Sequence, residues 1–280
     1  MLILLTLLIL VAIFILMGIY CNQNLKSDIC KLGFKNLPED FEGYRIAQIS
    51  DLHNTTYPND NEKILKALKN ARPNIIVITG DMIDSRRTDI KSAVELAGKI
   101  KKIAPCYYVC GNHEARMPEN YQLLLSKLRA AGINTLQNDK IHLSKGDGAI
   151  TLIGAEDPYV IRRVTDKPNS EILSEALAKL KEGEEENFTI LLVHRPEHFA
   201  VYQDYGIDLA LTGHTHGGQI RLPLIGGLFA PNQGFLPKLD AGIFRKQRTT
   251  LFISRGTGHS QFPVRFLNPP EIPIIELTKE

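Results

Sequence analysis

The feature that most constrains the fold is a regular alternation of two kinds of segment along most of the chain. Short, unbroken apolar runs rich in β-branched residues alternate with longer stretches in which apolar residues recur every three or four positions. The first pattern is typical of strands buried on both faces of a sheet, and the second is typical of amphipathic helices. The alternation therefore predicts a layered α/β domain. The predicted strands span residues 44–50, 74–79, 106–110, 149–155, 188–193, 208–212 and 250–254.

Four stretches have the helical spacing, and two of them close on a glycine, which commonly ends a helix. With 280 residues, of which 44% are apolar and 23% charged, the chain is long enough for one large globular domain or two small ones. The predicted helices span residues 60–71, 89–103, 119–132 and 170–183.

Residues 1–20 differ from the rest of the chain because they carry no charged side chain. As a helix they would span roughly 30 Å, the thickness of the hydrocarbon core of a bilayer. A cleaved signal peptide would have a basic start and a shorter apolar core, so we predict an uncleaved transmembrane anchor in the cell membrane. A juxtamembrane connector is expected at 21–43 and a single domain at 44–280. Lys26, Lys31 and Lys35 follow the span, and the positive-inside rule then places the domain on the cytoplasmic side.

Charge and cysteine content narrow the class of protein further. The net charge of +2 gives no electrostatic reason to expect a nucleic-acid partner. The four cysteines form no disulfide framework, since Cys106 and Cys110 would lie roughly 13 Å apart in one strand. This cysteine usage favours a reducing compartment.

Polar side chains follow five of the predicted strands at the point where each strand ends. Five of the eight histidines lie in these loops, together with two aspartates and an asparagine. Loops beyond the carboxyl ends of strands converge on the ligand crevice of an α/β sheet. Imidazole and carboxylate donors suit Mn²⁺, Fe²⁺, Zn²⁺, Ni²⁺ or Co²⁺, and the lack of cysteine donors argues against a structural zinc site. The candidate donors are Asp51, His53, Asp81, Asn112, His113, His194, His214 and His216.

The order of these groups resembles that of the calcineurin-like metallophosphoesterases. Their pattern DxH, GD, GNHE, H and GHxH occurs here as Asp51–His53, Gly80–Asp81, Gly111–Glu114, His194 and Gly213–His216. The resemblance runs from about residue 44 to the end of the chain. Segments 217–223 and 255–272 look like the membrane-associated branch, which includes enzymes similar to UDP-2,3-diacylglucosamine hydrolases. The family fold is an α/β sandwich of two mixed β-sheets flanked by helices, so this is the architecture we expect for residues 44–280.

The resemblance implies a role for each donor. Asp51, His53 and His216 would bind one divalent ion, and Asp81 would bridge it to a second ion bound by three further residues. The implied reaction is hydrolysis of a phosphoester by a hydroxide held between the two ions. The three residues of the second ion would be Asn112, His194 and His214.

His113 and Asp84 are the expected catalytic pair. His113 resembles the family histidine that protonates the leaving oxygen or stabilises the transition state. Asp84 occupies the place of the family carboxylate that orients this histidine, although a turn cap is an equally good interpretation of Asp84. After Asp84 the sequence departs from the phosphatase branch, so Arg86 and Arg87 are either phosphate contacts or a solvated pair. His259 lies either near the site or in a surface loop.

The segment 220–236 is apolar, rich in glycine and proline, and directly follows the last histidine of the pattern. It is either a buried connector or an exposed loop that dips into the membrane interface beside the active site. The second alternative makes a lipid-linked or nucleotide-lipid phosphodiester or pyrophosphate the expected substrate of a monomeric enzyme. The other function class that stays open is a membrane-anchored, metal-binding scaffold of the same fold without catalysis.

Overall fold

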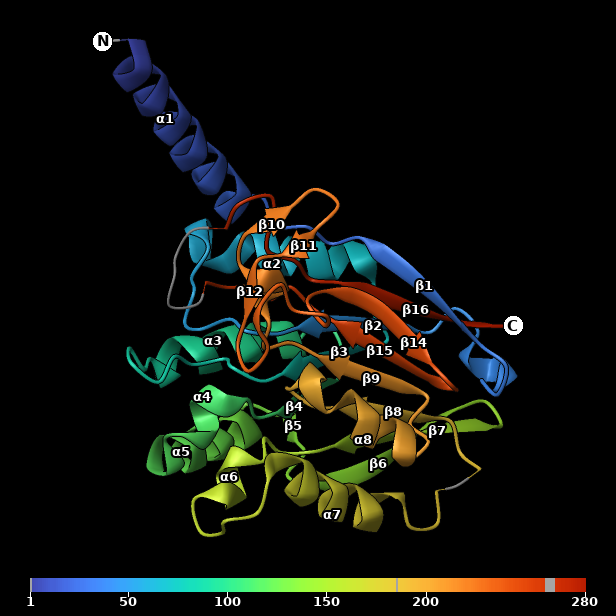
Figure 1. Ribbon diagram of the computed structural model, residues 1–280. Helices are drawn as coiled ribbons and strands as arrows, with labels where there is room; N and C mark the ends of the chain where they lie inside the picture. Colours follow the sequence, from blue (N-terminus) through green and yellow to red (C-terminus); the bar gives the residue numbers. More distant parts are fainter. Residues whose placement is uncertain (1, 185, 260–264) are drawn as a thin grey trace.

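The computed structural model describes residues 2–184, 186–259 and 265–280 and shows two six-stranded sheets packed face to face, with helices outside (Figure 1). In the first sheet the inner strands run parallel, and β16 is antiparallel to its neighbour β2. The strand order of this sheet is β1 (Ile29–Phe34), β16 (Ile274–Lys279), β2 (Arg45–Ile49), β3 (Ile75–Thr79), β4 (Cys106–Val109) and β5 (Asn134–Thr135).

The second sheet has a parallel centre and one antiparallel strand at each edge. Both sheets are therefore mixed, and the predicted sandwich of two mixed sheets flanked by helices is confirmed. The order of the second sheet is β14 (Gly242–Lys246), β15 (Thr249–Ile253), β9 (Leu209–Thr212), β8 (Thr189–Leu192), β7 (Gly148–Gly154) and β6 (Asp139–Lys145).

Helices cover the outer face of each sheet. Leu68, Leu96 and Leu124 from three helices share one buried cluster with the first sheet, while Leu177 and Tyr202 pack with the second. All seven predicted strands and all four predicted helices are present. The covering helices are α2 (Pro58–Ala71), α3 (Ile90–Lys101) and α5 (Pro118–Ala130) on the first sheet, and α7 (Asn169–Lys181) and α8 (Phe199–Asp204) on the second.

Successive residues of the central strands explain why their sequences are apolar without interruption. In β2, Ile46 points into the layer between the sheets, whereas Ala47 and Ile49 pack against the helices. Because side chains alternate across a strand and both faces are covered, every position of such a strand is buried. The inter-sheet layer holds the third cluster, which includes Val77 and Leu211 from the two sheets.

Short elements connect these layers, and several of them carry the polar loops. They are η1 (Glu39–Phe41), α4 (Asn112–Ala115), α6 (Tyr159–Arg162), η2 (Pro196–His198), η3 (His216–Gly218) and the two small hairpins β10 (Arg221–Leu222) with β11 (Gly226–Gly227) and β12 (Phe229–Ala230) with β13 (Gly234–Phe235).

The N-terminal helix α1 (Leu2–Gln23) projects outward from the sandwich (Figure 1). Its stretch 3–23 contains an 18-residue window with a mean hydropathy of 3.0, and by length and composition it is able to cross a membrane. Residues 29–34, within the expected connector, form the edge strand β1, which pairs in parallel with β16 from the other end of the chain. Local sequence patterns do not reveal such a distant pairing. The four cysteines are free.

Candidate metal centre

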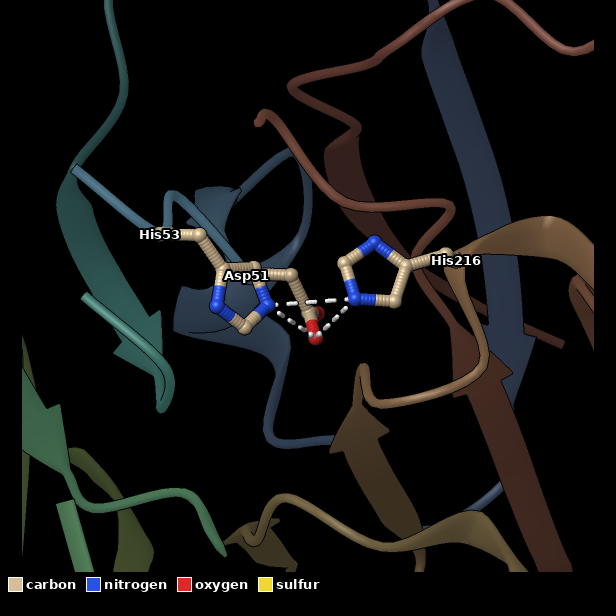
Figure 2. Close-up of side chains that lie close together, drawn as sticks. All are labelled: Asp51, His53 and His216. Carbon is tan, nitrogen blue, oxygen red and sulfur yellow. Dashed lines mark hydrogen bonds and ion pairs between the residues drawn. The ribbon is translucent and has the colours of Figure 1, made fainter. Parts of the chain in front are cut away.

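The polar loops of both sheets meet at one edge of the sandwich. Asp51 and His53 follow β2, Asp81 follows β3, and α4 follows β4, while His194 and His214 lie two residues beyond the ends of β8 and β9 in the second sheet. Figure 2 shows Asp51, His53 and His216 pointing toward one another. The structure thus brings together the seven side chains that the sequence pattern singled out as ligands.

One group of donors consists of Asp51, His53 and His216. Nε2 of His53 lies 3.1 Å from Nε2 of His216, and Oδ1 of Asp51 lies 3.4 Å from the His216 nitrogen (Figure 2). Oδ1 of Asp51 is also 3.9 Å from Nε2 of His53. The three side chains are buried, and their nearest donor atoms all lie within 4.8 Å of one another. This spacing suits a single ion placed among them.

A second group consists of Asp81, His194 and His214. Oδ2 of Asp81 lies 3.2 Å from Nε2 of His194, which is 3.2 Å from Nδ1 of His214. The same Asp81 oxygen is 3.6 Å from Nε2 of His53, and His194 is 3.9 Å from Asp51. Asp81 therefore lies between the two groups, which is the position of a bridging carboxylate.

Asn112 completes the set from the start of α4. Its side chain is buried, and its Oδ1 has no hydrogen-bond partner among the described residues. An amide oxygen left unpaired in the interior costs about 1–3 kcal/mol, so a partner for it is expected. Asn112 lines the same cavity as Asp81 and His214, which makes a cation the natural partner.

The backbone at the donors is strained. Asp51, His53, Asp81, His214 and His216 all have left-handed φ values, between 47° and 71°. Each such conformation costs a non-glycine residue roughly 1–3 kcal/mol, and strain of this kind persists where the structure enforces it at a functional site. Five of the seven candidate ligands thus adopt a backbone that local propensity opposes.

Two glycines allow the loops to approach closely. A β-carbon on Gly111 would overlap Oδ1 of Asp81, and one on Gly213 would overlap Ser50 Oγ and Oδ2 of Asp51. The glycines of the GNHE and GHxH motifs are therefore required for space beside the donors.

Glu114 holds two of these loops together. Its Oε2 accepts hydrogen bonds from the amides of Asp81 and Gly111, both at 2.9 Å, and its Oε1 accepts one from Ile83 at 3.1 Å. The carboxylate joins the loop after β3 to the start of α4. Glu114 therefore has a structural role beside the donors.

Burial sets the protonation of the imidazoles. It lowers the pKa of His53 to about 4 and the pKa values of His214 and His216 well below their usual range. These rings are therefore neutral at physiological pH, the form that binds a metal ion. Burial also raises the pKa of Asp51 to about 6. A desolvated carboxylate among neutral imidazoles is stabilised by a cation.

The carboxylate of Asp81 favours positive charge at or near His194. Burial opposes protonation of His194, yet the Asp81 carboxylate beside it raises its pKa to about 10. Nδ1 of His194 lies 2.8 Å from the carbonyl of Thr79, which fixes Nδ1 as the protonated nitrogen and turns Nε2 toward Asp81. The unpaired Asn112 oxygen, the neutral imidazoles of His53, His214 and His216 and the two buried carboxylates together fit a pair of divalent ions.

His113 lies beside the donors but has a different partner from the one expected. Its Nδ1 accepts a hydrogen bond from the amide of Ser85 at 3.0 Å, with the Ser85 hydroxyl at 3.1 Å. Asp84 instead accepts hydrogen bonds from the amide and guanidinium of Arg86, and its Oδ2 is 3.8 Å from Nδ1 of His53. Both interpretations of Asp84 have support, because its carboxylate caps the turn and also lies within 4.8 Å of the His53 and His113 nitrogens.

A cavity of about 480 Å³ opens onto the donors. Its lining includes two basic residues, Arg86 and Arg116, and two apolar residues from the segment 220–236, Phe229 and Pro231. Arg116 is steadied by the ring of Tyr159, 5.8 Å from its guanidinium carbon. The remaining lining includes Asp81, Asn112, His113, His214, Thr215, His216, Gln219 and Asn232.

Several residues around the centre carried no motif signal. Ser85, Arg116 and Asn268 lie outside the five donor motifs, although Asn268 is in the closing segment 255–272, and only their contacts in the fold reveal their roles. His259 donates its amide to Thr55 and is absent from the described lining of the cavity, and Arg87 is exposed. Residues 260–264, part of the closing segment used in the resemblance, lie outside the described residues.

Comparison with known proteins identifies the family to which the chain belongs. The sequence model of the calcineurin-like phosphoesterase family matches residues 44–218. The chain belongs to this family. It is 31% identical over 247 residues to the uncharacterized metallophosphoesterase YkuE of Bacillus subtilis, covering 86% of this chain and 81% of that protein. It is 29% identical to a transmembrane protein with metallophosphoesterase domain from Danio rerio, covering 87% of this chain and 55% of the relative.

Solved structures support the fold. TT1561 of Thermus thermophilus superposes with a TM-score of 0.52 at 10% identity, covering 76% of this chain and 89% of that chain. As a calcineurin-like phosphoesterase, the protein is a metal-dependent hydrolase of phosphoesters, in a family that uses two metal ions. Its apolar N-terminal helix and its transmembrane relatives indicate a membrane protein.

Proposed function

We propose that this phosphoesterase cleaves a phosphodiester or pyrophosphate bond in an amphiphilic, lipid-linked substrate at the membrane. The observation that carries the proposal is the meeting of two donor groups, one of them around Asp51 and the other around His194, at a cavity lined by both basic and apolar side chains. The proposed substrate class is inferred from the residues that line that cavity.

In this proposal Asp51, His53 and His216 would hold one divalent ion, and Asn112, His194 and His214 would hold the other. The Asp81 carboxylate would contribute to both sites and would offset part of the repulsion between two dications. When bound, such a pair lowers the pKa of water and neutralises charge on phosphoryl oxygens. The chain's own contribution is to fix seven donors in place before substrate arrives, through the enforced backbone and the Glu114 hydrogen bonds.

His113 is the proposed proton donor to the leaving oxygen. Because its Nδ1 accepts the Ser85 amide, the proton of the neutral ring resides on Nε2. His113 lines the cavity with Asp81 and Asn112, so this proton is available where a phosphoester would lie. Asp84 contacts no substrate in this proposal, and its carboxylate orients the ring of either His113 or His53.

The apolar wall supports the amphiphilic substrate. In the segment 220–236, Leu224 is fully exposed, and Ile225 and Phe235 are 60% and 77% exposed. Phe229 of the same segment is 47% exposed and also lines the cavity. An exposed apolar segment that also lines an active-site cavity suits a substrate whose tail stays in lipid. The basic Arg86 and Arg116 suit its phosphate groups.

The membrane arrangement completes the proposal. We place residues 1–20 across the bilayer as an anchor for the phosphoesterase domain, with the domain on the cytoplasmic side, as Lys26, Lys31 and Lys35 favour. The metal identity stays open among Mn²⁺, Zn²⁺, Fe²⁺, Ni²⁺ and Co²⁺, since the donors accept all of them.

Hydrolysis of a chromogenic phosphodiester by the full-length protein with Mn²⁺ tests the function. Asp81→Asn should abolish measurable metal-dependent hydrolysis, and His113→Ala should lower kcat by about 10²–10⁴ while two ions remain bound. His142→Ala is the matched control, because this histidine lies away from the centre and contacts Glu184.

A non-catalytic scaffold is the alternative that this experiment separates. A scaffold would bind two Mn²⁺ ions yet hydrolyse neither diesters nor pyrophosphates, and His113→Ala would change nothing. Full loss of metal binding in Asp81→Asn together with unchanged hydrolysis would contradict the proposed centre itself.

A further inference from the structure

A short segment of the chain, Arg265–Asn268, lies between the N-terminal helix and the metal centre, and we call it the strap. On the side of the centre, Nδ2 of Asn268 donates to the carbonyls of His216 at 2.7 Å and Gln219 at 3.1 Å. Nη2 of Arg265 donates to the carbonyl of Gly258 at 2.7 Å and lies 3.4 Å from Nδ1 of His216. The strap therefore contacts both the main chain and the ring of His216.

The backbone that the strap supports is unusual. His216, Gly217, Gly218 and Gln219 all have positive φ, at 50°, 62°, 75° and 64°. The carbonyl of His216 accepts a hydrogen bond from the amide of Gln219 at 3.1 Å, but the run forms only a single irregular turn. Asn268 adds hydrogen bonds to the carbonyls at both ends of this run from a fully buried position, and a β-carbon on Gly217 would overlap its amide oxygen. Asn268 therefore supports the conformation that aims His216 at the centre.

The other side of the strap is attached to α1. The amide of Arg265 donates to Oδ1 of Asn22 in the last turn of the helix at 3.1 Å. The ring of Phe266 stacks on Phe14, with 5.0 Å between centroids and 22° between planes. Phe14 lies eight residues before Asn22, about 12 Å along the helix axis. The strap therefore runs along the helix as well as touching its end.

We propose that the strap couples the position of α1 to the metal centre, with Asn268 as the positioning residue for His216. Asn268 contacts no substrate; it acts by holding the turn 216–219. The contacts of Asn22 and Phe14 hold the strap in turn. This inference rests on the proposed function, because it needs an ion bound by Asp51, His53 and His216. It implies that this ion binds tightly only when α1 is seated against the domain.

Titration of the full-length, metal-stripped protein in lipid nanodiscs with Mn²⁺ alone tests the coupling. The wild type should bind two ions. Asn268→Ala should weaken one of them by about 10- to 100-fold, the usual effect of losing a residue that supports a ligand, and leave the other within about twofold. The retained ion shows that the variant is folded. The spin-coupled signal of a Mn²⁺ pair in electron paramagnetic resonance should change to that of a single ion.

Variants on the helix keep the test independent of Asn268. Phe14→Ala should weaken the same ion several-fold, and Ile15→Ala, an exposed neighbour on the helix, should not. The double variant Phe14→Ala with Phe266→Ala should be no weaker than Phe266→Ala alone, as expected for two residues acting through one contact.

The outcomes separate the coupling from the function it rests on. A wild type that binds fewer than two ions would overturn the dinuclear centre and the coupling together. Two ions with equal loss in Phe14→Ala and Ile15→Ala, or no loss in either, would overturn the coupling alone. Additive effects of Phe14→Ala and Phe266→Ala would do the same.

Discussion

Individual residues at the centre are held in place by contacts that leave little free volume. The clearest case is Gly111, whose φ of −105° is open to any residue, so that its importance is purely steric. A β-carbon at this position would lie 2.6 Å from the amide nitrogen of Asp81 and would overlap its Oδ1. Asp81 can thus take its position between the two donor groups only because Gly111 has no β-carbon.

Gly111→Ala should therefore weaken Mn²⁺ binding on the order of tenfold or more without removing any donor. Calorimetric titration of the purified variant measures this. The control is Gly98→Ala, in the interior of α3, where a β-carbon meets nothing within 4 Å. It should bind metal normally and gain about 1 kcal/mol in the free energy of unfolding, because alanine favours helix. Normal metal binding by Gly111→Ala would contradict the steric argument.

The same scale shows what a motif can and cannot predict. The pattern of Asp51, Asp81 and His194 is readable because each donor directly follows an apolar strand. Asn268 has no such signal, since it serves His216 through the backbone carbonyl and lies in a loop of its own. Similarly, the distance between Ser85 and His113 depends on how two loops pack, and spacing in the sequence contains no information about it.

At the scale of elements, the strands and helices that local pattern predicts are those buried on one or both faces. The elements it misses are strands whose pairing partner lies far away in the sequence and strands that are very short. β1 gains its place from β16 at the other end of the chain, and the hairpins within 220–236 have two-residue strands. Their composition signalled an apolar loop beside the site; only the fold shows that its side chains are exposed.

This exposed segment yields a prediction about chain length in the substrate. Leu224→Ser with Ile225→Ser should lower kcat/KM on a long-chain amphiphilic phosphodiester presented in vesicles by about tenfold, since each side chain loses apolar contact with lipid. Hydrolysis of a short-chain, water-soluble analogue should be unchanged, because neither residue is a donor or lines the cavity.

The control for this pair is Val164→Ser, a similarly exposed apolar side chain two residues after the end of α6. The helix α6 lies on the part of the sandwich far from α1 (Figure 1). It should leave both rates unchanged. Equal rates on the two substrates for the Leu224 and Ile225 variant would remove the support for a membrane-facing loop.

At the scale of the whole molecule, a buried acid far from the centre makes stability depend on pH. Burial alone would raise the pKa of Glu184, but hydrogen bonds from Thr151, Asn187, Lys140 and His142 lower it to about 2. The unfolded chain takes up this proton first, near its ordinary pKa of 4.5. The stabilisation is therefore complete above about pH 5 and is lost as the pH falls toward 2.

Glu184→Gln should lower the free energy of unfolding at pH 7 by about 2 kcal/mol, the scale of a hydrogen-bonded buried charge. The difference from wild type should shrink to nearly zero by about pH 2. Chemical denaturation at a series of pH values measures both. Glu182→Gln, at an exposed position two residues away, should match wild type throughout. A constant difference between Glu184→Gln and wild type would contradict the titration.

The arrangement of donors has a consequence for how the two halves of the sandwich stay closed. Under the proposed ligand set, each ion takes donors from both sheets: Asp51 and His53 with His216 for one, and Asn112 with His194 and His214 for the other. The two ions would then link the two sheets at the same edge of the sandwich. Without the ions, the sheets would remain joined by their apolar core but could separate at that edge, where backbone amide hydrogens would exchange with solvent.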